Sequence, residues 1–136
     1  MAKLILDTGP LVALLNRDER LHSECLDFFK TFRGLLISTE PVLTEALYLL
    51  NNSLKHQQKC IEFVQTAVQL IPSSRISLQR CSSLIEKYKD VPMDFADATL
   101  VVLAEEIQTQ EIFTLDHRGF QIYRWGRNHT FKIYPE

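Results

Sequence analysis

Short apolar runs alternate along the chain with longer segments in which apolar residues recur three and four positions apart. The short runs have the length and aliphatic composition of buried strands. We expect strands over residues 3–6, 35–38 and 111–115 and around residues 131–133. The longer segments have the period of helices with an apolar face, and we expect helices over residues 11–15, 22–32, 39–50, 55–70, 77–88 and 94–108. This alternation predicts an α/β domain with a mostly parallel sheet.

Two connections between these elements are less regular. Residues 71–76 contain Pro72 and join two helices, with room for a short strand. Residues 116–120 follow the third predicted strand and contain Gly119, which favours a turn. No internal repeat, low-complexity segment or long linker interrupts the pattern, and 136 residues suit one domain. We therefore expect a single domain over residues 1–136.

The composition is that of an ordinary globular protein, with 46% apolar and 24% charged residues. A formal net charge of −2 argues against a generally basic nucleic-acid-binding surface and leaves room only for a local one. The chain has three cysteines, Cys25, Cys60 and Cys81, and they are widely spaced. An odd number without close pairs is typical of reduced cysteines in the core of a cytosolic protein. The first apolar run is too short for a signal peptide, and no stretch reaches the ~20 apolar residues of a membrane span. We expect a cytoplasmic protein with no membrane segment.

The helix expected from residue 94 begins with two acids. Asp94 follows Pro92 closely and is a good N-cap. Asp97 lies in the first turn, between Ala96 and Ala98 and ahead of a long apolar run. The positive end of the helix favours both acids. It explains Asp97 less well, because a charge among apolar neighbours is buried unless something neutralises it.

Three other acids stand in comparable positions. Asp7 and Asp116 each follow a predicted strand, and Glu45 lies between apolar residues of a predicted helix. The carboxyl ends of parallel strands meet at one edge of a sheet, so we expect Asp7 and Asp116 there. The helices that follow neighbouring strands can bring Glu45 and Asp97 to the same edge. Four such carboxylates repel one another unless a cation is present, and an all-oxygen set suits Mg²⁺ or Mn²⁺. The alternative is that each acid separately caps a helix or forms an ion pair.

Four short motifs around these acids resemble, in order and spacing, those of the PIN-domain ribonucleases, and most closely the VapC-type toxins of toxin–antitoxin pairs. They are residues 4–11 with Asp7, 44–47 with Glu45, 97–100 with Asp97 and 114–120 with Asp116. Each motif alone is weak evidence, and four in order are strong. The resemblance covers nearly the whole chain and implies a PIN-like three-layer α/β/α fold with a short central sheet. It also implies that these four acids surround divalent metal.

The activity implied by the resemblance is metal-dependent hydrolysis of RNA phosphodiester bonds. A Mg²⁺ ion held by Asp7 and Asp97 would lower the pKa of a bound water from about 15.7 toward neutrality and counter charge on the phosphate. A second ion, about 3.5–4 Å away in such sites, would be completed by Glu45 and Asp116. We expect Asp7 and Asp97 as primary ligands, Glu45 as ligand or proton acceptor, and Asp116 acting partly through water.

Several residues near the motifs have two interpretations. Asp94 is either an outer partner of the metal site or only the helix cap. Thr8 and Thr114 either orient the carboxylates or occupy ordinary turn and strand positions. His117 and Arg118 either contact a phosphate or belong to an exposed polar turn.

The segment from residue 124 to residue 129 mixes cations with the only tryptophan of the chain. Trp125, with Arg124 and Arg127 beside it, either stacks on an unpaired RNA base or packs half-buried in a surface hairpin.

Partners follow from the resemblance and from the apolar helices. The resemblance implies a cognate antitoxin whose amphipathic helix lies in a groove. The apolar helices over residues 43–50 and 60–70 suggest a homodimer. Within the family, the alternative is a nuclease of RNA processing or turnover without an antitoxin. A non-catalytic PIN-fold binding module is opposed by four intact acids. A receiver-like phosphoacceptor module needs a lysine after a later strand, and only Lys132 follows Lys89.

Overall fold

The computed structural model describes residues 2–136, in which it has five strands and seven helices. The strands are β1 (Lys3–Leu6), β2 (Leu35–Ser38), β3 (Val68–Leu70), β4 (Glu111–Phe113) and β5 (Lys132–Tyr134). The helices are α1 (Thr8–Leu15), α2 (His22–Thr31), α3 (Glu40–Leu49), α4 (Leu54–Ala67), α5 (Arg75–Lys87), α6 (Phe95–Ile107) and α7 (His117–Ile122).

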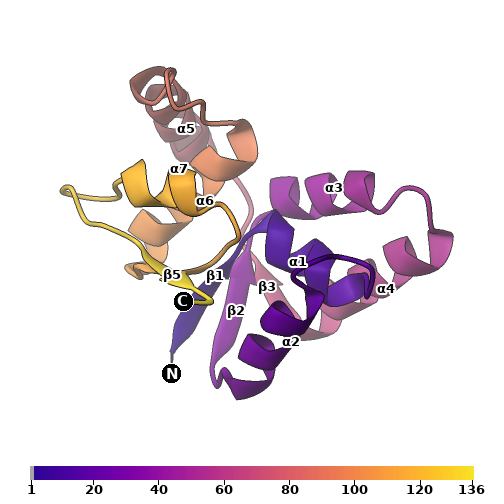
Figure 1. Ribbon diagram of the computed structural model, residues 1–136. Helices are drawn as coiled ribbons and strands as arrows, with labels where there is room; N and C mark the ends of the chain where they lie inside the picture. The colour runs from indigo at the N-terminus through magenta and orange to yellow at the C-terminus, as the bar shows by residue number, and fades with distance from the viewer. Residues whose placement is uncertain (1) are drawn as a thin grey trace.

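The strands form one sheet in the order β3-β2-β1-β4-β5, and every pair of neighbouring strands is parallel. Figure 1 shows α1, α2 and α4 on one side of this sheet and α5, α6 and α7 on the other. The predicted three-layer α/β/α fold is confirmed, and the sheet is parallel throughout. The chain runs outward from β1 to β3 and then returns to the other side of β1 with β4. Ligands bind at such a switch in strand order, outside the carboxyl ends of the strands.

The centre of the core is β1 together with α6. Leu4, Ile5 and Leu6 are almost completely buried because β1 is paired on both edges and covered on both faces. Residues 98–104 of α6 are all buried, which explains why this helix has an almost unbroken apolar sequence. The three cysteines are buried and unpaired. Among residues 2–136, no helix combines the length and apolarity needed to cross a membrane.

Three expectations about individual elements were wrong. The helix expected over residues 55–70 ends at Ala67, and Val68–Leu70 is β3, which pairs with β2. The segment expected to be a turn after Asp116 is helix α7. The first helix begins at Thr8 rather than at residue 11, because the Asp7 side chain accepts a hydrogen bond from the Thr8 amide and caps it. Apolar periodicity alone does not separate short helices from short strands, and Gly119 does not prevent a helix that is well capped.

Candidate active site

The carboxyl edge of the sheet holds the predicted acids. Asp7 directly follows β1, and its backbone amide donates to Phe113 at the end of the neighbouring β4. Asp116 lies just beyond β4 and caps α7 by accepting the Gly119 amide. Glu45 projects from α3, and Asp97 from the first turn of α6. These four acids and Asp94 line one cavity of about 370 Å³.

Two buried threonines orient these carboxylates. The Thr114 hydroxyl donates to Asp7 Oδ2 at 2.7 Å and accepts the Asp116 amide at 3.0 Å. The Thr8 hydroxyl donates to Glu45 Oε1 at 2.6 Å. Because the Thr8 amide also donates to Asp7 Oδ1 at 2.7 Å, both oxygens of Asp7 have a donor. Thr8 and Thr114 therefore connect three of the four acids by hydrogen bonds.

The Asp7 carboxyl is expensive to ionise in this pocket. Burial is the largest cause, and it raises the pKa of Asp7 from 3.8 to about 6 although Thr114 and the Thr8 amide oppose the rise. The negative charges of Glu45 and Asp116 raise it further. A cation placed among these groups would remove both costs.

The Asp97 carboxyl is even more costly to ionise than that of Asp7. Burial and then the neighbouring charge of Asp94 raise the pKa of Asp97 from 3.8 to about 8. Asp94 and Asp97 form a reciprocal cap at the start of α6. Asp94 Oδ1 accepts the Asp97 amide at 2.8 Å, and Asp97 Oδ2 accepts the Asp94 amide at 3.1 Å. Asp94 thus caps the helix and also lines the cavity.

The donor set of the cavity fits a hard divalent cation, because it consists of carboxylate oxygens without cysteine or histidine. The acids are spread around the cavity rather than drawn together. Within residues 2–136, no three histidine, cysteine, aspartate or glutamate side chains are close enough as they stand to hold an ion.

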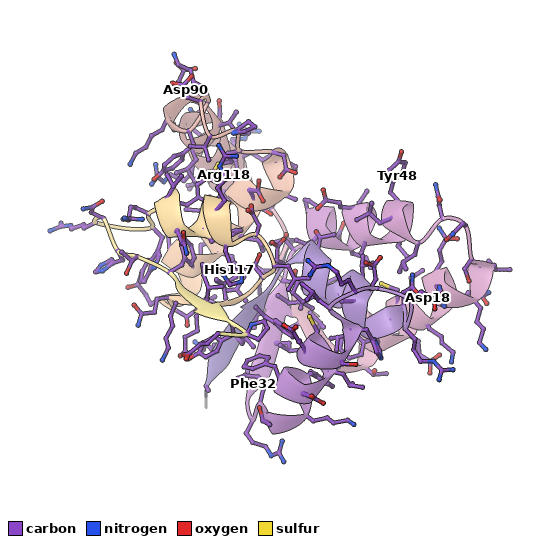
Figure 2. All side chains as sticks on the ribbon, viewed as in Figure 1. Asp18, Phe32, Tyr48, Asp90, His117 and Arg118 are labelled. Carbon is purple, nitrogen blue, oxygen red and sulfur yellow. The ribbon has the colours of Figure 1, made fainter. Side chains whose placement is uncertain are left out.

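The predicted RNA-contacting residues fall into two groups. His117 and Arg118 are exposed on α7, as Figure 2 shows, and Arg127 is exposed in the following turn. Arg124 Nη1 donates to three carbonyl oxygens at the end of α7. Trp125 is only 7% exposed, and its indole donates to the Thr130 carbonyl. The expectation that Trp125 is free to stack on a base is therefore wrong, and its ring is buried more fully than in the alternative interpretation, a surface hairpin with a half-buried tryptophan.

One residue near the acids was missed in the sequence. The Tyr123 hydroxyl lies 3.5 Å from Asp97 Oδ2 and 3.4 Å from the Pro92 carbonyl oxygen. Asp116, Gly119 and Tyr123 are spaced three and four apart, so a helix places them on one face. Because the segment was expected to be a turn, this helical spacing was not used to place Tyr123 beside the acids.

These features define the class of the protein, a three-layer α/β/α domain with clustered carboxylates at the carboxyl edge of a parallel sheet. The family model of the PIN domain matches residues 4–125. The chain therefore belongs to the PIN-domain family.

Proteins that are similar to this chain carry VapC or VapBC names. Ribonuclease VapC26 of Mycobacterium tuberculosis is 28% identical, and the alignment covers 97% of this chain and 100% of that protein. The structure of Mycobacterium tuberculosis VapC20, described as a sarcin-ricin loop cleaving toxin, has a TM-score of 0.74 at 16% identity and covers 80% of this chain and 86% of that one. The structure of Rickettsia felis VapBC2 bound to a promoter DNA fragment has a TM-score of 0.69 at 14% identity, with coverage of 98% and 99%. The resemblance to VapC-type PIN domains is thereby confirmed.

Proposed function

We propose that this protein is a metal-dependent endoribonuclease and the toxin of a type II toxin–antitoxin system, acting from one domain over residues 1–136. The observation that carries the proposal is a single cavity lined by Asp7, Glu45, Asp97 and Asp116 in a PIN domain. The names of VapC26, a ribonuclease, and of VapC20, a sarcin-ricin loop cleaving toxin, support it. We also propose a cytoplasmic location, which three buried cysteines outside disulfides support.

Asp7 and Asp97 would hold the cation, Mg²⁺ or Mn²⁺, with Glu45 and Asp116 beside them. When bound, such a cation supplies Lewis-acid polarisation of the phosphate and activation of water. Thr114 and the Thr8 amide keep the Asp7 carboxylate in one orientation. Asp7 and Asp97 then act as anions, although burial raises the pKa of Asp7 to about 6 and that of Asp97 to about 8 in the absence of a cation.

Glu45 is the proton acceptor in this proposal. Its Oε1 atom is held by the Thr8 hydroxyl, which leaves Oε2 to take the proton from the attacking water. The water oxygen bonds to phosphorus, the bond from phosphorus to the 3′ oxygen of the preceding nucleotide breaks, and that oxygen takes a proton from solvent and leaves as a hydroxyl group. Asp116 lies at the edge of the site next to α7, and the Gly119 amide fixes its carboxylate by donating to Oδ1.

RNA binding in this proposal uses the cations that the fold leaves free. His117, Arg118 and Arg127 are exposed, and His117 and Arg118 directly follow Asp116, so we assign phosphate contacts to these three residues. Arg124 and Trp125 serve the fold instead, for the reasons given above.

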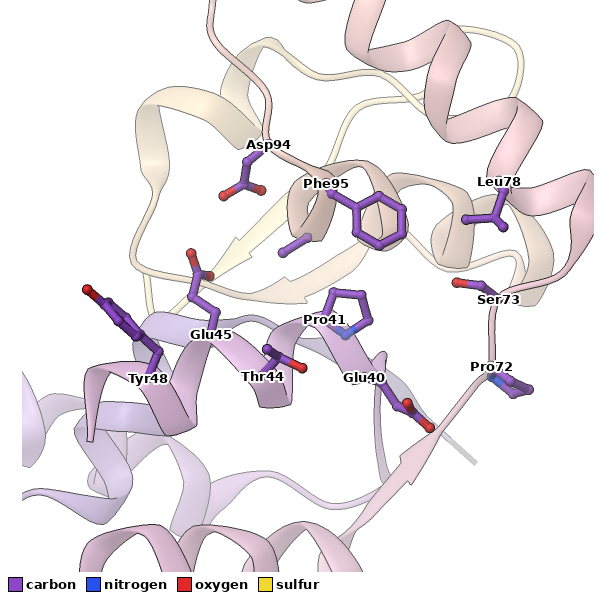
Figure 3. Close-up of a pocket in the computed structure, with 11 residues that line it drawn as sticks. Glu40, Pro41, Thr44, Glu45, Tyr48, Pro72, Ser73, Leu78, Asp94 and Phe95 are labelled. Carbon is purple, nitrogen blue, oxygen red and sulfur yellow. The ribbon is translucent and has the colours of Figure 1, made fainter. Parts of the chain in front are cut away.

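An antitoxin peptide is the partner that the neighbouring groove supports. A cavity of about 960 Å³ lies between α3, the start of α6 and α5, and Figure 3 shows Glu45 and Asp94 at one end of it and Glu40 toward the other. Tyr48 is 71% and Phe95 41% exposed along it, so it offers apolar side chains beside acids. An amphipathic segment with one cation matches this surface. A nuclease of RNA turnover would lack such a partner, and a small adjacent gene would favour the toxin.

A homodimer is proposed from the apolar residues that remain exposed on α4. Leu54 and Ile61 are exposed there although both are large and aliphatic. Light scattering of the purified protein at micromolar concentration tests this assembly, and the mass of one chain would contradict it.

The cleavage activity is tested with purified protein and total RNA in Mg²⁺, in Mn²⁺ and in EDTA. We expect defined fragments with either cation and intact RNA in EDTA, because the four acids need a cation to act together. Restoring Mg²⁺ after EDTA should restore cleavage. If folded protein binds Mn²⁺ but leaves all RNA intact, the catalytic proposal fails and a binding module becomes the better explanation.

Replacing Thr114 by valine is expected to slow RNA cleavage by about 10- to 100-fold, the usual loss when an outer partner of a metal ligand is removed. Valine keeps the shape of threonine but donates nothing to Asp7 Oδ2 and accepts nothing from the Asp116 amide. Initial cleavage rates measure the effect. Thr114→Ser keeps the hydroxyl and should retain most of the rate, and equal rates in the serine and valine variants would show that the hydroxyl is not needed.

A further inference from the structure

Tyr123 is held rigidly at the end of α7. Its side chain is 1% exposed, and its ring packs edge-to-face against Tyr88 and Phe120 with centroid distances of 5.1 Å in both cases. It follows the last turn of the helix, and its amide donates to the Gly119 carbonyl. A ring fixed in this way presents its hydroxyl at one place only.

That place lies between the loop before α6 and the carboxylate of Asp97. The hydroxyl is 3.4 Å from the Pro92 carbonyl oxygen and 3.5 Å from Asp97 Oδ2. Both oxygens are acceptors, so the phenol can donate its hydrogen to the Pro92 carbonyl oxygen or to Asp97 Oδ2. A distance of 3.5 Å is the outer limit of a hydrogen bond, and such contacts often shorten in the complete site.

The two oxygens of Asp97 have different surroundings. Oδ2 accepts the Asp94 amide at 3.1 Å and lies beside the Tyr123 hydroxyl. Among the hydrogen bonds of residues 2–136, none reaches Asp97 Oδ1. Both donors to the Asp97 carboxylate therefore converge on Oδ2, and Asp97 lines the cavity with the other acids.

Gly119 permits this arrangement. A Cβ atom at position 119 would lie 3.1 Å from the Tyr123 ring and 2.5 Å from Asp116 Oδ2. Only glycine lets the ring and the Asp116 carboxylate approach the helix at the same time. Helix α7 thus carries the fourth acid at its first turn and, at its end, a hydroxyl that reaches the third acid.

We propose that Tyr123 is a positioning residue that fixes Asp97 by its Oδ2 atom and turns Oδ1 toward the cation; this role rests on the proposed metal-dependent function. A neutral donor suits the task, because it stabilises the carboxylate without cancelling the negative charge that attracts a cation. A phenol has an ordinary pKa of about 10, so near neutral pH it keeps its proton and donates.

A purely structural role is the competing explanation. Through the Pro92 carbonyl, the same hydroxyl also joins α7 to the loop before α6. Tyr88 offers a matched control, because it belongs to the same aromatic cluster and its hydroxyl accepts the Arg124 amide at 2.9 Å. Tyr123→Phe and Tyr88→Phe each remove one buried hydroxyl and keep the ring, but only the first removes a donor to Asp97.

The test compares Mn²⁺ affinity, measured by calorimetry, with thermal unfolding for both variants. We expect Tyr123→Phe to bind Mn²⁺ about tenfold more weakly than wild type, the lower end of the loss for outer partners of metal ligands. We expect Tyr88→Phe to bind Mn²⁺ like wild type even if it unfolds at a lower temperature. Cleavage by Tyr123→Phe should recover at saturating Mn²⁺, since the loss lies in binding.

Equal Mn²⁺ affinity in Tyr123→Phe and wild type would overturn the positioning role and leave the proposed nuclease intact. A folded wild-type protein that binds no Mn²⁺ would contradict the proposed function itself, and the positioning role with it. The two failures are therefore distinguishable from the same binding curves.

Discussion

Replacing Asp7 by asparagine is expected to lower the rate of RNA cleavage roughly a thousandfold, beyond the 10- to 100-fold loss that follows removal of an outer partner of a metal site. Asp7 stands at the end of the central strand, where the strand order reverses. It is the acid with donors on both oxygens, from the Thr8 amide and the Thr114 hydroxyl. Asparagine has nearly the same shape but carries no charge, so the cation loses a primary ligand.

The fold should survive this substitution. Burial makes the charged form of Asp7 costly, so a neutral amide in its place relieves that cost in the metal-free protein. Asp90→Asn is a suitable control, because it makes the same chemical change at an exposed position that Figure 2 shows far from α3. Cleavage is measured on total RNA with Mg²⁺ for both variants. Wild-type activity in folded Asp7→Asn would remove Asp7 from the site.

The positions of the acids could be predicted because they depend on a few strong rules. Uninterrupted apolar runs such as Leu4–Leu6 form strands buried on both faces, and parallel strands present their carboxyl ends at one edge. An aspartate directly after such a run, as Asp7 is, must therefore lie at that edge. Asp97 was indicated differently, by a charge inside an apolar helix. All four acids line the same cavity as a result.

The elements that the sequence did not reveal are those decided by tertiary contacts. Val68–Leu70 continues the apolar pattern of α4 and becomes a strand because β2 offers it a ladder of hydrogen bonds. Helix α7 is only six residues long and is held by the Asp116 cap and the buried Phe120. An isolated helix of that length is unstable in water. The position of Tyr123 depends on α7, because its amide donates to the Gly119 carbonyl and its ring packs on Phe120, so it was not predictable without that helix.

The stability of the metal-free protein is expected to fall as the pH rises from about 5 to 8. The pKa of Asp7 is raised in the fold from 3.8 to about 6, and that of Asp97 to about 8. At a pH between the unfolded and the folded pKa of each group, the folded protein binds more protons than the unfolded chain. Each group therefore stabilises the fold fully below pH ~4, and this contribution is lost as the pH rises through its raised pKa. At about 1.4 kcal/mol for each pKa unit, Asp7 alone contributes up to about 3 kcal/mol.

A divalent cation should reverse this dependence, because it binds the ionised carboxylates that destabilise the empty pocket. Urea unfolding from pH 5 to pH 9, in EDTA and in millimolar Mg²⁺, measures the effect. We expect Mg²⁺ to raise the free energy of unfolding much more at pH 8 than at pH 5. Asp97→Asn should flatten the EDTA curve above pH 7, because its amide does not titrate. A metal-free protein that grows more stable from pH 5 to pH 8 would show that these two carboxyls are already compensated by the fold, and that the pocket has no electrostatic need for a cation.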